Sequence, residues 1–100
     1  MGSYIIGINR YNRRISLIMN TILYFTAAWC GPCRALAPRM EKLKGQINYR
    51  KIDVDNNREM SAKYSVRNVP SLVLIDQNGQ ELNRMVGVQS DEAILNFYNG

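Results

Sequence analysis

The stretch YFTAAWCGPCRALAP, residues 24–38, places Cys30 and Cys33 where an apolar strand pattern becomes a helical one. They are the only 2 cysteines of the chain. Residues 22–25 form a continuous apolar run, which is typical of a central strand buried on both faces. Apolar residues then recur at helical spacing over residues 36–43. The pattern predicts a strand, then a helix, with the cysteine pair at their junction.

A cysteine at the start of a helix is suited to redox chemistry. Unpaired backbone N–H groups and the positive end of the helix dipole favour the thiolate of Cys30 there. Cys33 lies one turn further and is expected to be more shielded. We therefore expect Cys30 to attack a substrate disulfide and Cys33 to resolve the mixed disulfide. Pro32 fixes φ near the helix start, and Gly31 keeps the approach to Cys30 open.

Two other uses of the cysteine pair are weaker. A structural disulfide closing so short a loop restrains the unfolded chain little, and a reducing compartment would open it. A structural zinc site needs four ligands as a rule, whereas this chain has 2 cysteines and 0 histidines. No metal site is predicted.

The sequence around the pair resembles the thioredoxin family. The similarity runs from Ile22 to about Phe97 and includes WCGPC (29–33) and VRNVPSLVLIDQNG (66–79). Further matching positions are Phe25, Ala27, Pro38 and Gly87. The resemblance, to a short variant of the family, implies a reversible dithiol–disulfide oxidoreductase that reduces protein disulfides. It implies no bound cofactor and electrons supplied by a thioredoxin-reductase-like partner.

The resemblance also implies a substrate-binding surface. It makes Pro70 a cis proline packed against the cysteines, and Val69 a source of backbone hydrogen bonds for an extended peptide. Trp29 and Gly87 would border the same surface. Without the resemblance, an ordinary trans proline at a strand start and a core-packed tryptophan are the simpler interpretations.

Tyr24 and Lys51 mark a departure from the family. The resemblance implies a buried aspartate at position 24, held near a lysine that matches Lys51, where it helps to deprotonate the second cysteine. Lys51 is expected to lie in an otherwise apolar strand environment, where burial without a carboxylate favours its neutral form. Snorkelling or a hydrogen bond to Tyr24 is the alternative. We hypothesise that attack by Cys33 relies on water or Lys51, and that turnover is slower or more alkaline than is usual in the family.

The fold class predicted is α/β. The helix is expected to end with Gly45 as its C′ residue, and strand signals follow at 47–54, 71–75 and 80–88. Residues 55–57 offer caps for a short helix in which Met60 and Tyr64 pair, and a last helix is expected over 91–98. A turn at 77–79 joins the third and fourth strands, and Ser90 caps the last helix. This order predicts a thioredoxin-like fold, a central mixed four- to five-stranded sheet flanked by helices on both faces.

The chain is expected to be one domain over residues 1–100. Residues 1–20 would form a shortened opening strand and helix; without that pair the core is closer to that of a glutaredoxin. The basic and apolar stretch at residues 13–28 is too short and too interrupted to span a bilayer. A cleaved signal peptide there would sever the first strand. We therefore expect a monomer in the cytoplasm, without membrane association.

The net charge of +5 keeps other functions open. A basic surface can steer acidic partners or attract nucleic acid weakly. The alternatives are a thioredoxin-fold binding module for a protein or nucleic acid, and a glutaredoxin-like, oxidase or isomerase activity, which the redox potential distinguishes from a reductase.

Overall fold

The computed structural model describes residues 19–100, and the predicted opening strand and helix lie almost entirely outside this range. The elements are β1 (Thr21–Thr26), α1 (Gly31–Lys42), β2 (Tyr49–Asp53), α2 (Arg58–Lys63), β3 (Ser71–Ile75), β4 (Glu81–Val86) and α3 (Asp91–Asn99). This is the predicted order of strands and helices.

The strands form a mixed four-stranded sheet in the order β2-β1-β3-β4. β1 is parallel to β2 and antiparallel to β3, and β3 is antiparallel to β4. The antiparallel β3–β4 pair confirms the predicted hairpin. Among the described residues, β2 is therefore an edge strand and β1 a central one.

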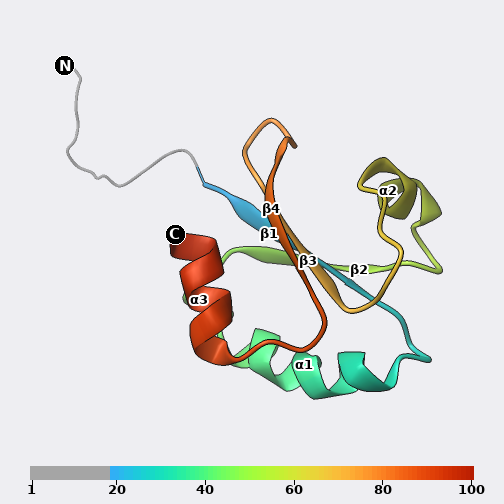
Figure 1. Ribbon diagram of the computed structural model, residues 1–100, viewed down its shortest axis with the longest axis horizontal. Coiled ribbons are helices and arrows are strands. Elements are labelled where there is room, and N and C mark those ends of the chain that lie inside the picture. Colours follow the sequence, from blue (N-terminus) through green and yellow to red (C-terminus); the bar gives the residue numbers. More distant parts are fainter. Residues whose placement is uncertain (1–18) are drawn as a thin grey trace.

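Helices cover both faces of the sheet, as predicted (Figure 1). Side chains alternate along β1, so that Ile22 and Tyr24 pack with α1 and α3 while Leu23 and Phe25 pack with Tyr64 beyond α2. α1 presents Leu36 and Met40 to the first of these cores. Burial of β1 on both faces explains why its sequence is continuously apolar.

The start of α1 agrees with the prediction, but its end does not. Cys30 is the N-cap, Pro32 lies in the first turn, and Pro38 is accommodated inside the helix. The helix ends at Lys42 with Leu43 as its C-cap. Gly45 does not have positive φ and is not the cap that glycine usually provides.

The predicted second and fourth strands are both shorter in the structure. Ile47 donates its N–H to the carbonyl of Leu43 and so belongs to the turn that leaves α1. The expected strand 80–88 is reduced to β4, which lies between Gly79 at φ +83° and Gly87 at φ +92°. Left-handed backbone at these two positions is the conformation that glycine adopts readily. These turns carry the chain out of β3 and back toward α3.

Candidate active site at the start of helix α1

The cysteine pair occupies the first turn of α1. Cys30 Sγ accepts a hydrogen bond of 3.1 Å from the backbone N–H of Cys33, as an N-cap side chain does. The two residues form a disulfide, with their Cα atoms 5.3 Å apart. No acidic side chain lies in the first turn. The N–H group and the uncompensated dipole therefore both favour negative charge on Cys30 when the disulfide is reduced.

Both cysteines are buried in this oxidised state. Each is 3% exposed, and they pack with Ala27, Val54 and Val69. Residue exposure alone thus does not show the expected contrast between an open Cys30 and a shielded Cys33. Their surroundings do differ, because Cys30 Sγ lies 3.6 Å from the carbonyl oxygen of Val69. At that distance a reduced Cys30 thiol can donate a weak hydrogen bond to Val69.

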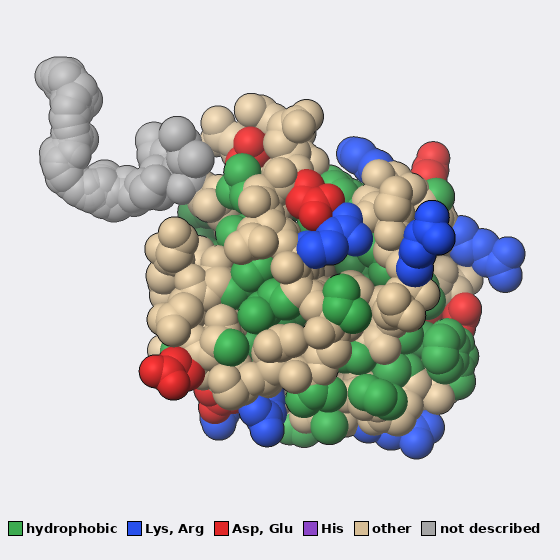
Figure 2. Space-filling model, viewed as in Figure 1, with side chains coloured by type: hydrophobic (Ala, Val, Ile, Leu, Met, Phe, Trp, Pro, Cys, Tyr) green, Lys and Arg blue, Asp and Glu red, His purple; other side chains and the backbone are tan. Residues whose placement is uncertain are grey.

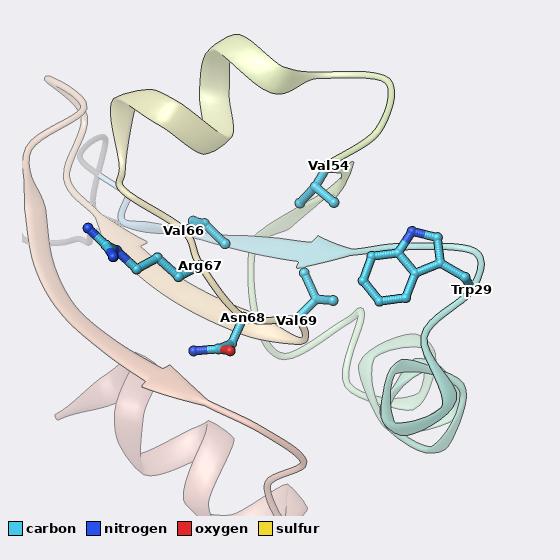
Figure 3. A pocket seen from close by; sticks show the side chains of 6 residues that line it. All are labelled: Trp29, Val54, Val66, Arg67, Asn68 and Val69. Atoms are coloured by element: carbon cyan, nitrogen blue, oxygen red, sulfur yellow. The ribbon is translucent and has the colours of Figure 1, made fainter.

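An apolar groove of about 250 Å³ lies beside the pair. We call it the Trp29 groove; it is lined by Trp29, Val54, Val66, Arg67, Asn68 and Val69. Figure 3 shows Trp29, Val54 and Val69 close together at one end, while the Arg67 side chain extends at the other. Figure 2 shows the surface from the same side as Figure 1. Hydrophobic side chains gather there near the end of the sheet where α1 begins.

Trp29 forms the exposed wall of this groove. It is 67% exposed, which rules out the alternative of a core-packed tryptophan. Its indole Nε1–H donates a hydrogen bond of 2.8 Å to the carboxylate of Asp55. That bond holds the ring in place while one side remains open to a ligand.

Pro70 follows the groove residue Val69, and the bond between them is cis, as expected. Pro70 is buried, and its carbonyl oxygen accepts a hydrogen bond of 2.8 Å from the N–H of Gly87. Gly87 is therefore placed against Pro70. Neither residue is part of the groove lining. Gly31 and Pro32 are exposed at the start of α1, and a Cβ atom at Gly31 would meet no other atom within 4 Å.

Tyr24 contacts the backbone of Cys33 from the core of the protein. It is 1% exposed, and its hydroxyl donates a hydrogen bond of 3.4 Å to the carbonyl of Cys33. Lys51 is the cross-strand neighbour of Tyr24 in the β1–β2 register. Of the alternatives for Lys51, burial is wrong, because β2 is an edge strand among the described residues and the side chain reaches solvent, as a snorkelling lysine does. Tyr24 donates its hydroxyl to Cys33 and not to Lys51.

Sequence reasoning missed Val54, Asp55, Val66 and Arg67. Because β1 and β2 are parallel, their carboxyl ends meet at one edge of the sheet, which brings Val54 and Asp55 beside Trp29. Ligands bind at the carboxyl ends of parallel strands in open α/β sheets, so this signal was present in the predicted strand order. Arg67 carried no comparable signal.

Other functional features were sought over residues 19–100. No group of three or more potential metal-binding side chains occurs there. No helix in that range is long and apolar enough to cross a membrane.

A dithiol pair at a helix N-cap, beside a cis proline and an apolar groove, defines the class of thiol–disulfide oxidoreductases. Comparison with known proteins gives the family. The thioredoxin family model matches residues 6–99. The chain therefore belongs to the thioredoxin family.

Individual relatives agree. The chain is 36% identical over 92 residues to thioredoxin from Haemophilus influenzae, a match that covers 84% of this chain and 85% of that protein. It is 37% identical over 76 residues to an H-type thioredoxin from Fagopyrum esculentum, covering 73% of this chain and 65%, just under two thirds, of the relative. A mutant thioredoxin structure from Halobacterium salinarum is 38% identical with a TM-score of 0.74, covering 80% of this chain and 72% of the other.

Proposed function

We propose that this protein reduces disulfide bonds in other proteins. The observation that carries the proposal is the position of Cys30 Sγ, which accepts the Cys33 N–H at the N-cap of α1 and lies beside Val69 at the Trp29 groove. This position combines stabilisation of a thiolate with a surface on which a peptide can lie.

The reaction has two exchange steps. The Cys30 thiolate attacks one sulfur of the substrate disulfide, forming a mixed disulfide and releasing the other substrate sulfur as a thiolate, which takes a proton from solvent. The Cys33 thiolate then attacks Cys30 Sγ, forming the Cys30–Cys33 bond and releasing the second substrate thiolate. Substrate gains two electrons and the cysteine pair loses two. The pair found in this structure is the product state of that reaction.

The Trp29 groove supports a peptide substrate. Its apolar wall and floor, formed by Trp29, Val54 and Val66, suit an apolar side chain next to the substrate cysteine. The half-buried Val69 presents its carbonyl near Cys30. An extended substrate strand in this position can pair its backbone with Val69, which gives affinity without requiring one particular sequence.

Renewal of the dithiol requires an electron donor. We propose a thioredoxin-reductase-like partner, with no cofactor bound to this chain. A relative from Mycobacterium leprae, described as a bifunctional thioredoxin reductase/thioredoxin, supports this proposal: it is 39% identical over 75 residues that cover 71% of this chain and 16% of that protein. Both activities are named for that one protein.

We further propose that the protein acts as a monomer in the cytoplasm. The use of both cysteines in one redox pair supports a reducing compartment, where a reductase can regenerate the dithiol. A single redox pair within one chain supports action without a second copy. Gel filtration of the reduced protein tests the monomer, and localisation of a tagged chain tests the compartment.

Insulin disulfide reduction tests the proposed activity. We expect the wild-type protein to reduce insulin with dithiothreitol as donor, and the Cys30→Ser variant to do so no faster than dithiothreitol alone. A binding module would show no activity in either protein, and salt-dependent nucleic-acid binding unaffected by Cys30→Ser would favour that alternative. The reduction potential gives the direction: a value near that of thioredoxins, about −270 mV, supports a reductase, whereas one near −120 mV supports an oxidase.

A further inference from the structure

Among the described residues, Arg67 is the only charged one that lines the Trp29 groove. Figure 3 shows it at the end of the groove away from Trp29, with its guanidinium pointing outward from that end. The side chain is exposed, and no carboxylate of residues 19–100 forms an ion pair with it. The far end of the groove therefore carries a positive charge that the described part of the chain leaves unneutralised.

The backbone on both sides of Arg67 is held in place by hydrogen bonds. The N–H of Val66 donates to the carbonyl of Ser61 at 2.8 Å. The hydroxyl of Ser71, a residue that is 2% exposed, donates to the carbonyl of Asn68 at 2.5 Å. When a ligand pairs with Arg67, the ordering cost therefore falls mainly on the side chain and not on the loop.

The Trp29 end of the groove has the opposite charge. The carboxylate of Asp55 accepts the indole N–H of Trp29 at 2.8 Å. Cys30 packs against Val69 at this same end. An acidic side chain directly beside the substrate cysteine would therefore lie near a carboxylate, whereas one further along the peptide would lie near Arg67. The two ends of the groove thus favour different charges at different positions of a peptide.

The spacing along the chain sets the position at which Arg67 acts. Arg67 precedes Val69 by two residues, and two residues of extended chain span at most about 7 Å. A substrate strand that pairs with Val69 advances about 3.3 Å per residue. A side chain two or three residues from the substrate cysteine therefore comes within reach of the Arg67 guanidinium.

We propose that the Trp29 groove selects disulfide-containing peptides with an acidic residue two or three positions from the reactive cysteine, and that Arg67 recognises this residue. The inference rests on the proposed function and adds a substrate class to it. A planar guanidinium can bind a carboxylate through two parallel hydrogen bonds. Because the pair is exposed, its contribution is modest and falls with salt. Arg67 therefore governs the choice between substrates and not the exchange chemistry.

Single-turnover reduction of matched peptide disulfides tests this selection. Each peptide has one cysteine, joined to the cysteine of an identical copy, and an apolar residue beside it. Glu or Lys stands at one of four positions, two or three residues before or after the cysteine. The reduced protein, freed of its reductant, is mixed with excess peptide and quenched in acid, and the released peptide thiol is measured by chromatography. The measured quantity is the ratio of the Glu-peptide rate constant to the Lys-peptide rate constant.

The matched variants are Arg67→Gln, Arg67→Lys and Lys44→Gln. Lys44 is exposed beyond the C-terminal end of α1. That helix is about 18 Å long and separates Lys44 from Cys30 by more than the screening length of about 8 Å at physiological salt. Comparing the ratio between proteins cancels the reactivity of each peptide and any general effect of a substitution.

We expect Arg67→Gln to lower the ratio about twofold to twentyfold at one or more of the four positions, through one lost attraction and one lost repulsion. Arg67→Lys is expected to keep most of the wild-type ratio, and Lys44→Gln all of it. The effect of Arg67→Gln should shrink in NaCl at about 0.5 M. The urea midpoint of Arg67→Gln is expected to match wild type, because the side chain is exposed.

The proposal is overturned if Arg67→Gln and Lys44→Gln give the same ratio at all four positions. It is also overturned if the effect of Arg67→Gln persists undiminished in high salt, because the residue would then act through packing and not through its charge. Failure of the proposed function looks different, because the wild-type protein would then release no thiol from any of the peptides.

Discussion

The two sides of the Cys30–Cys33 disulfide differ in chemical character. On the groove side, Trp29 and Val69 offer apolar surface and one backbone carbonyl to a peptide. On the Tyr24 side, Tyr24, Cys33 and Lys51 line a small polar cavity of about 150 Å³ between β1, β2 and the start of α1. A disulfide-exchange site has two separate requirements. The attacking sulfur needs a surface that holds the substrate, and the resolving sulfur has to become a thiolate before it can attack.

Removal of the resolving sulfur is the strongest way to separate the two sides. Cys33→Ser keeps the groove and Cys30 but removes the nucleophile of the second step. We expect this variant to accumulate as a covalent mixed disulfide with its substrate, and Cys30→Ser to form none, as measured by non-reducing electrophoresis and mass spectrometry. If both single-cysteine variants form adducts equally well, the two sulfurs do not have different roles.

Truncation of Trp29 tests the groove side alone. Trp29→Ala removes the exposed apolar wall, and loss of such an aromatic anchor costs more than about 1 kcal/mol of binding. We expect KM for insulin to rise at least about fivefold. The rate at which the protein reduces a small aromatic disulfide reagent should change little. Stability should hardly change, since the side chain is 67% exposed. Equal losses with both substrates would show that Trp29 acts on the sulfur chemistry and not on peptide binding.

Removal of the Tyr24 hydroxyl tests the other side of the disulfide with the smallest structural change. Tyr24→Phe keeps the buried ring and deletes the 3.4 Å hydrogen bond to the Cys33 carbonyl. We expect a loss of about 0.5–1.5 kcal/mol in the free energy of unfolding, measured in urea, because that carbonyl loses its side-chain partner. The rate at which Cys30 attacks a small aromatic disulfide reagent should be unaffected. A stability equal to wild type would show that the hydroxyl does not hold Cys33.

An ion pair on β4 serves as a reference far from both sides. The Arg84 guanidinium, 2.6 Å from Glu81, lowers the pKa of the Glu81 carboxyl below its ordinary value by hydrogen bonding and charge. A lowered pKa in the folded state contributes stability above the unfolded pKa, about 4.3, which is lost as pH falls through the folded pKa. We expect Glu81→Gln to cost a few tenths of a kcal/mol at pH about 7, after screening by solvent.

The same variant should match wild type in acid, where the wild-type carboxyl is protonated. Urea unfolding at both pH values measures the difference, and insulin reduction should be unchanged throughout. A deficit that persists in acid would mean that Glu81 contributes through packing and not through its charge.

The sequence was most informative where local chemistry decides the structure. Ser90 caps α3 by accepting the Ala93 N–H, and β3 covers the predicted residues 71–75, because cap residues and buried β-branched or apolar runs act over a few positions. The Cys30 cap at the start of α1 follows from the same kind of signal. Family resemblance added the cis bond before Pro70, which local sequence alone would not favour.

Features that depend on strand order were harder to predict. The sequence left burial and snorkelling of Lys51 both open, and the edge position of β2 decides for access to solvent. The hydrogen bond between Trp29 and Asp55 joins residues 26 positions apart and has no local signal. The small polar cavity beside Cys33 exists because Tyr24, Cys33 and Lys51 come together from three elements. Such contacts follow from packing of the sheet and helices, not from spacing along the chain.

Competitive alkylation of the reduced protein shows which of the two cysteines is the activated thiol. The folded dithiol is treated at neutral pH with less than one equivalent of iodoacetamide, and the modified residue is identified by peptide mass mapping. We expect rapid modification of Cys30, whose thiolate is stabilised at the helix N-terminus, with Cys33 largely unmodified. Slow and equal modification of both cysteines would contradict it.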